Sequence, residues 1–223
     1  VRQLAQLDEH GVTCVLYDGS AEAAARRENL SAADAALPAV WATDIALDAQ
    51  GCPRFTLNAA NFAGMPAPVS VPCALELRGM HNVSNACSAA AVGLAAGMTA
   101  DQVAAALGAA QPESGRQEVL HTPAGVTVIN DAYNANPDSM RASLSTFAAL
   151  EVSGRRIAVL GDMGELGDFA PALHEEVGAF VAGCKLDSLV CVGQLAQRIA
   201  AGAQAAGMPA GAIVTVADWQ EAL

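Results

Sequence analysis

The second half of the sequence alternates strand-like and helix-like segments, and this alternation constrains the fold more than any other feature. After Pro112 strands and helices are predicted in turn. The strands are at residues 126–130, 156–160, 189–192 and 212–216, and the helices between them are at 137–150, 171–182 and 195–206. Such alternation is typical of βαβ units in a parallel, doubly wound sheet. Ligands bind these sheets beyond the carboxyl ends of the strands, which directs attention to Asp131, Gly161-Asp162 and Gly193.

The first half has a different pattern. Strands are predicted at residues 12–17, at 40–49 and 54–58 around a turn at Gln50-Gly51, and at 69–77, where apolar residues alternate with polar or small ones. An alanine-rich helix is then predicted from Asn82 to near Gly97, and a capping box over Thr99–Gln102 opens a second helix. We therefore predict an α/β chain of two domains: residues 1–112, with antiparallel strands plus helices, and residues 113–223, with the parallel sheet.

Composition excludes several classes of protein. The 223 residues are 53% hydrophobic and 15% charged, which excludes a disordered chain, and the apolar runs are too short to cross a membrane. A net charge of -12 argues against binding to the phosphate backbone of a nucleic acid, which requires a basic surface. The six cysteines form no C-x-x-C pair, as expected in the cytoplasm. The start at Val1, without Met or a signal peptide, and a helix predicted to begin at Trp219 indicate a fragment.

One candidate site lies where residues 78–85 lead into the first long helix. His81, Asn82 and Asn85 fall in its first turn, and two amides one turn apart can contact an adenine edge. The alternative is that Asn82 is an N-cap and Asn85 is merely polar. For His81 we favour a structural, hydrogen-bonded role over metal binding, because no second ligand stands at a suitable spacing.

A second candidate is the loop that follows the strand at residues 126–130. Asp131 at a strand end is suited to hold ribose hydroxyls, and Tyr133, Asn134 and Asn136 exceed what a helix cap needs, although a purely structural turn and cap is the alternative. Arg116 lies at the interdomain boundary. Its guanidinium could reach a phosphate when two domains close, or be a solvated surface group.

The segment Gly161–Gly167 has glycines after a strand but not the G-x-G-x-x-G spacing, and Asp162 would repel a pyrophosphate. We therefore reject a Rossmann dehydrogenase. His174 lacks the second histidine of H-E-x-x-H, so the default expectation is a solvated helix face, although His174 could reach back to the Gly161 loop.

Four segments together resemble one family. They are Gly79–Ala86, Gly115-Arg116, Asn130–Met140, and Val159–Gly167 with His174 downstream. In order and spacing they resemble the Mur ligases of peptidoglycan synthesis, and within them the MurF branch. The first two and Asp131 are also shared with folylpolyglutamate synthase, whereas Asn130–Pro137 and Gly161–Gly167 are specific to the MurF branch.

The resemblance implies an ATP-dependent ligase of three domains. Residues 1–112 would be the latter part of its central ATPase domain, and residues 113–223 most of its Rossmann-like C-terminal domain. Asn82 and Asn85 would contact adenine, Arg116 the phosphates during catalysis, and Asp131 the ribose, with Tyr133, Asn134 and Asn136 in a nucleotide or substrate loop. The cofactors would be ATP and Mg²⁺. The substrates would be UDP-N-acetylmuramoyl-tripeptide and D-alanyl-D-alanine, joined through an acyl phosphate by a cytoplasmic monomer.

The departures from the family pattern bear on activity. The only lysine is Lys185, so no P-loop G-x-x-x-x-G-K-[ST] exists in this sequence, and the Mg²⁺ ligands are expected outside it. The chain alone is predicted to be inactive. Two alternatives remain open: a relative of folylpolyglutamate synthase, which the Tyr133–Pro137 loop argues against, and a non-catalytic nucleotide-binding module.

Overall fold

The computed structural model describes residues 14–221, and the chain divides into two compact units. The N-terminal unit is Val1–Pro112 and the C-terminal unit is Glu113–Leu223. Each has its own hydrophobic core. The boundary at Pro112 is the point where the sequence pattern changes.

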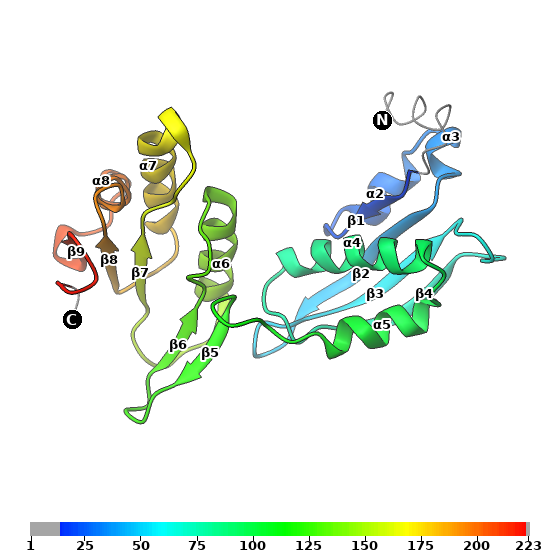
Figure 1. Ribbon diagram of the computed structural model, residues 1–223, viewed down its shortest axis with the longest axis horizontal. Coiled ribbons are helices and arrows are strands. Elements are labelled where there is room, and N and C mark those ends of the chain that lie inside the picture. The colour runs from blue at the N-terminus through cyan, green and yellow to red at the C-terminus, as the bar shows by residue number, and fades with distance from the viewer. Residues whose placement is uncertain (1–13, 222–223) are drawn as a thin grey trace. The chain divides into compact units, whose positions relative to one another are not determined.

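A four-stranded sheet forms the frame of the N-terminal unit (Figure 1). Its strands are β1 (Leu16–Asp18), β2 (Ala39–Leu47), β3 (Pro53–Ala60) and β4 (Val69–Ala74), in that order. The β2–β3–β4 pairs are antiparallel, as predicted, and the turn at Gln50-Gly51 is confirmed. The sequence prediction was wrong at the edge, because β1 runs parallel to β2.

That parallel pairing has a local cause, because two short helices separate the strands. Helices α2 (Ala23–Glu28) and α3 (Ala32–Ala35) carry the chain back to the start of β2, although no helix was predicted between the strands at 12–17 and 40–49. The predicted strand at 12–17 is shorter and shifted, and Val12 and Thr13 lie outside the described residues. The predicted strand at 69–77 ends at Ala74.

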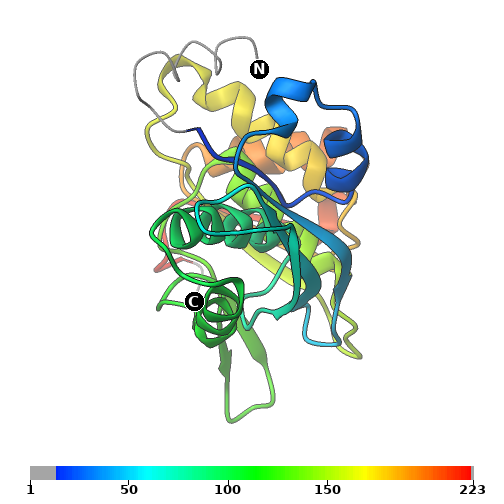
Figure 2. The same ribbon diagram turned by 90° about the vertical axis from the view of Figure 1, so that its right-hand side faces the viewer.

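Two longer helices cover one face of this sheet. Helix α4 (His81–Ala95) packs on β1 and β2, and α5 (Ala100–Ala109) packs on β4 and on α4 (Figures 1 and 2). Buried side chains between these layers include Leu57, Leu75 and Val83. The predicted capping box is confirmed: the Thr99 hydroxyl accepts from the Gln102 N–H, and the Gln102 side chain accepts from the Thr99 N–H.

The C-terminal unit contains a parallel sheet of β7 (Ile157–Gly161), β8 (Ser188–Val192) and β9 (Ile213–Val216). Ala158, Leu189 and Cys191 are buried on one face, packed with residues of α7 (Ala170–Val181) and α8 (Ala196–Ala205). Ile157, Val159 and Val214 are exposed on the opposite face. Within the described residues the parallel sheet is therefore covered on one side, whereas the doubly wound arrangement that we predicted has helices on both.

Helices α7 and α8 approach each other closely because glycine stands at two contact points. A Cβ atom on Gly178 would lie 2.0 Å from the Ile199 carbonyl oxygen, and one on Gly202 would lie 2.1 Å from the Glu175 carbonyl oxygen. Only residues without a side chain fit there. Helix α6 (Pro137–Ala149) adds Met140 and Leu144 to the same core.

The strand predicted at residues 126–130 belongs to a different sheet from the one expected. The observed strand, β6 (Thr127–Asn130), pairs antiparallel with β5 (Glu118–His121) and not with the parallel sheet. A tight turn explains this difference, because the Gly125 N–H donates to the Thr122 carbonyl and the Thr122 N–H donates to the Val126 carbonyl. At the chain's end, residues 219–221 form a turn, and the rest of the predicted helix lies outside the described residues.

Candidate functional site

A carboxylate organises the turn that carries Arg116. Glu118, at the start of β5, accepts hydrogen bonds from the Gly115 N–H (3.1 Å), the Ser114 hydroxyl (3.1 Å) and the Asn130 side chain (3.3 Å). The bond from the Gly115 N–H is the largest of the causes that hold the pKa of Glu118 below its ordinary value, followed by the bond from Ser114. The turn is therefore tied to the base of the β5–β6 hairpin.

The loop after β6 lies directly against this turn. The Tyr133 N–H donates to the Gly115 carbonyl (3.1 Å), and the Gln117 N–H donates to the Asp131 carboxylate (3.2 Å). The Arg116 guanidinium carbon lies 4.1 Å from the centroid of the Tyr133 ring. Three residues that the sequence singled out, Arg116, Asp131 and Tyr133, thus form one cluster, although Asp131 does not follow a parallel strand as expected.

This cluster is open to solvent. The Arg116 side chain is 55% exposed, with the Glu113 carboxylate 3.9 Å from its Nε, and Tyr133 is 67% exposed. The Arg116 guanidinium, with its N–H groups at the surface, can bind an anion. The Asp131 carboxylate of the same cluster can accept a hydrogen bond from a hydroxyl group. The chemistry of the cluster therefore suits a phosphate next to a sugar.

The two asparagines of the same loop have local partners. Asn136 is the N-cap of α6, and its side-chain oxygen accepts from the Ser139 N–H at 2.8 Å. Pro137 is the first residue of that helix, as predicted. The Asn134 side chain accepts from the Ala135 N–H at 2.8 Å. The structural alternative thus accounts for Asn136, and a ligand role for either asparagine stays a prediction.

In the N-terminal unit, Asn82 and Asn85 are joined. The Asn82 amide donates to the Arg78 carbonyl (2.7 Å) and accepts from the Asn85 amide (3.0 Å). Asn82 is not the N-cap that the alternative required, because Met80 occupies that position and α4 begins at His81. Asn85 is exposed and oriented by Asn82, which is compatible with contact to a purine edge.

The loop after β7 contains its own anion. The Asp162 carboxylate accepts from the Ala196 N–H at 2.6 Å, at the first residue of α8. A Cβ atom on Gly193 would lie 2.4 Å from the same carboxylate, so only glycine fits beside it. One N–H at the N-terminus of α8 is therefore already engaged by a side chain.

The solvated face expected by default for His174 is wrong, and the alternative, that His174 reaches this loop, is confirmed. Its ring is fully buried: Nε2 accepts from the Met163 N–H (2.9 Å), and Nδ1 lies 2.6 Å from the Ala170 carbonyl oxygen. Since Nε2 accepts, the proton must be on Nδ1, which donates to that carbonyl. His174 thus joins the loop after β7 to helix α7.

We expect His174→Leu to lower the free energy of unfolding of the C-terminal unit by about 3 kcal/mol, because it leaves the buried Met163 N–H without an acceptor. Urea unfolding of the chain, followed by circular dichroism, measures this change. His121→Leu on the exposed hairpin is the matched control and should cost under about 0.5 kcal/mol. Equal losses in the two variants would contradict the bridging role.

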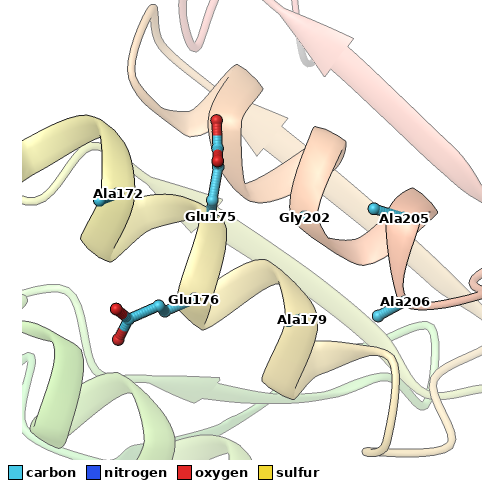
Figure 3. Close-up of a pocket in the computed structure, with 7 residues that line it drawn as sticks. All are labelled: Ala172, Glu175, Glu176, Ala179, Gly202, Ala205 and Ala206. Atoms are coloured by element: carbon cyan, nitrogen blue, oxygen red, sulfur yellow. The ribbon is translucent and has the colours of Figure 1, made fainter.

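A shallow pocket between α7 and α8 has a structural explanation. Small residues form most of its wall, and the two charged side chains at its rim are Glu175 and Glu176 (Figure 3). Glu175 forms an ion pair with Arg198 (3.0 Å), and Glu176 pairs with Arg141 (3.1 Å). The pocket therefore offers apolar surface and no unpaired catalytic group.

Reactive cysteines, metal-binding groups and membrane-spanning helices find no support in the described residues. Burial raises the pKa of Cys87 to about 12 and of Cys73 and Cys191 to about 11, so these free thiols are poor nucleophiles. Among residues 14–221 no group of three or more His, Cys, Asp or Glu side chains is placed to hold a metal ion. Nor does that part of the chain contain a helix long and apolar enough to cross a membrane.

Sequence reasoning did not identify Glu118 or Gln117 as part of the cluster. The signal for Glu118 was its position three residues after Gly115, where a side chain can accept from the backbone of the preceding turn. Gln117 contributes only its N–H, which carries no sequence signal.

Comparison of the sequence and the fold with known proteins identifies the class of protein. Residues 115–223 match the family described as "Mur ligase, glutamate ligase domain". These residues therefore belong to the Mur ligase family.

Individual relatives lie in the MurF branch. The UDP-N-acetylmuramoyl-tripeptide--D-alanyl-D-alanine ligase of Mycobacterium tuberculosis is 45% identical over 159 residues, which cover 69% of this chain and 30% of that protein. A crystal structure of MurF from Acinetobacter baumannii is 30% identical, with a TM-score of 0.69, over 95% of this chain and 44% of that one. MurF from Thermotoga maritima, solved in complex with ADP, shares the fold (21% identity, TM-score 0.55, 81% and 45% of the two chains). The chain thus spans about a third of the length of the curated relative.

Proposed function

We propose that this chain is part of an ATP-dependent ligase that adds D-alanyl-D-alanine to UDP-N-acetylmuramoyl-tripeptide in peptidoglycan precursor synthesis. The observation that carries the proposal is the contact of the Gly115-Arg116 turn with the Asp131–Tyr133 loop, since these are two of the motifs that the MurF resemblance assigns to nucleotide binding. The names of the relatives and the ADP bound in one of them support it.

In this proposal the chain's residues bind and orient ATP. Asn85, held by Asn82, contacts the adenine edge, and Asp131 accepts hydrogen bonds from the ribose hydroxyls. Arg116 neutralises charge on the phosphates while the γ-phosphoryl group moves to the substrate's terminal carboxylate. The amine of D-alanyl-D-alanine then attacks the acyl phosphate, and phosphate leaves.

The remaining parts of the catalytic machinery are proposed to lie outside this sequence. Phosphoryl transfer needs a P-loop lysine and Mg²⁺, and Lys185, the only lysine, follows helix α7 and is not in a P-loop motif. The carboxylates of the cluster do not form a metal-binding group with their neighbours in the described part of the chain. We therefore propose that the 223-residue chain is inactive alone and works within a longer cytoplasmic monomer.

The direct test is an assay of the full-length protein that contains this chain. Incubation with ATP, Mg²⁺, UDP-N-acetylmuramoyl-tripeptide and D-alanyl-D-alanine should yield ADP, phosphate and the pentapeptide product, detected by mass spectrometry. Glutamate and folate acceptors serve as controls, because product from those alone would favour the folylpolyglutamate synthase alternative.

The role of Asp131 makes a sharper prediction. In the full-length ligase, Asp131→Ala is expected to raise KM for ATP roughly 10- to 100-fold, since hydrogen bonds to a charged group contribute about 1.5–3 kcal/mol. Asp131→Asn keeps an oxygen for the Gln117 N–H and should separate the loss of charge from the loss of loop structure. An unchanged KM for ATP in Asp131→Ala would argue against ribose binding.

A further inference from the structure

The contact of Arg116 with the Tyr133 ring restricts the orientation of the arginine side chain before a ligand binds. A long, exposed arginine has many rotamers, and fixing one of them for ligand binding costs conformational entropy. Here the guanidinium lies over an aromatic ring at 4.1 Å, within the range at which cation–π attraction acts. The ring therefore selects one orientation before any ligand arrives.

The backbone fixes the ring beside the arginine. The Tyr133 N–H donates to the carbonyl of Gly115, the residue that precedes Arg116. The Gln117 N–H, on the other side of Arg116, donates to Asp131, two residues before Tyr133. The two hydrogen bonds bracket the stacked pair, so the ring and the guanidinium are presented from backbone segments that are joined to each other.

Two carboxylates near Arg116 compete with the Tyr133 ring for its guanidinium. Glu113 lies 3.9 Å from the Arg116 Nε, and Glu118 lies in the same turn, two residues after Arg116. Either could draw the cation toward itself. A stacked guanidinium is held by its face, while its five N–H donors point outward in the plane, where a phosphate can meet them.

We infer that Tyr133 is a positioning residue that holds the Arg116 guanidinium ready for the phosphate groups of the nucleotide. The inference rests on the proposed function, and it assigns Tyr133 an action through Arg116 without contact to the reacting atoms. The feature that matters is the aromatic face; the Tyr133 hydroxyl has no part in it.

The test is a double-mutant cycle in the full-length ligase, with ATP and both substrates present. Tyr133→Leu should lower kcat about two- to fivefold, the range that corresponds to a cation–π contribution of about 0.5–1 kcal/mol at an exposed site. Tyr133→Phe keeps the ring and should retain the parental rate. In an Arg116→Ala background, Tyr133→Leu should have no further effect, because the group it positions is gone.

The outcomes are distinct. An unchanged rate in Tyr133→Leu, a Tyr133→Phe variant as slow as Tyr133→Leu, or an equal loss with and without Arg116 would each overturn the inference. A parent enzyme without ligase activity would instead count against the proposed function. Thermal unfolding of each variant separates folding defects from positioning, and Tyr133 is exposed enough that the midpoint should not move.

The chain contains a matched control for loss of a stacked pair. Arg27 lies over the Trp41 ring at 4.2 Å in the N-terminal unit, outside every motif assigned to the nucleotide. Arg27→Met removes that stack and should leave kcat unchanged. A loss as large as that of Tyr133→Leu would show that the assay reports general destabilisation, and the inference would fail.

Discussion

In the full-length protein, which we propose to be a ligase, Arg116→Ala is expected to lower kcat roughly 100-fold, the largest effect on activity that we predict. Removing one preorganised donor from a site of developing negative charge commonly costs a factor of this size. The fold should be little affected, with a change within about 1 kcal/mol, because the side chain is 55% exposed and its ion pair with Glu113 is long at 3.9 Å. Steady-state phosphate release measures the rate, and thermal unfolding measures the stability.

Two further variants sharpen this experiment. Arg116→Lys keeps the charge and loses the planar fork, so its rate should fall between those of the parent and Arg116→Ala. Arg198→Ala is the matched control, because Arg198 is a similarly exposed arginine of the same unit, paired with Glu175 on the helices. If both Arg116 variants turned over like the parent, Arg116 would be a solvated surface group and the phosphate role would be lost.

The largest effect on stability is expected at Gly178. In Gly178→Ala the new methyl group would lie 2.0 Å from the Ile199 carbonyl oxygen and 2.8 Å from the Ala203 N, so α7 and α8 must separate. We expect a loss of about 3 kcal/mol or more, although alanine has the higher helix propensity. Domains of this size have about 5–15 kcal/mol in total, so the C-terminal unit would be severely weakened.

Hydrogen exchange followed by mass spectrometry tests this expectation and locates it. Amides of α7 and α8 should lose protection in Gly178→Ala, while those of α4 and α5 in the N-terminal unit keep it. Gly154→Ala is the control, since a Cβ atom there meets nothing within 4 Å. Unchanged protection of α7 and α8 would mean that the close approach of the helices is not needed for their stability.

Local signals predicted much of this fold. The capping box at Thr99, the first turn of α6 at Pro137 and the alternation from residue 156 onward all depend on neighbours within a few residues, and the structure contains each of them. The pairing of β6 with β5 depends on a turn at Thr122–Gly125 and on a partner strand that was not predicted, so the parallel-sheet assignment was wrong. Helix α2 has only six residues, too few for a clear periodic pattern.

The candidate site shows the same division. Arg116, Asp131 and Tyr133 were identified as chemically suitable residues, and their contact required tertiary information, because a hydrogen bond from the Gln117 backbone has no counterpart in residue type. The use of Asn136 as a helix cap was an open alternative, and its hydrogen bond with the Ser139 N–H supports it. The adenine role of Asn85 remains a prediction.

The Asp162 carboxylate at the start of α8 has a consequence for inhibitor design. Compounds that imitate a pyrophosphate usually gain affinity from the free N–H groups at a helix N-terminus, and in this protein the Ala196 N–H is already engaged by Asp162. Such a compound would have to displace the Asp162 carboxylate. Because Asp162 belongs to the same chain, it competes at a very high effective concentration. Medicinal chemistry aimed at this unit is therefore better directed to the solvent-exposed guanidinium of Arg116 and its neighbouring ring.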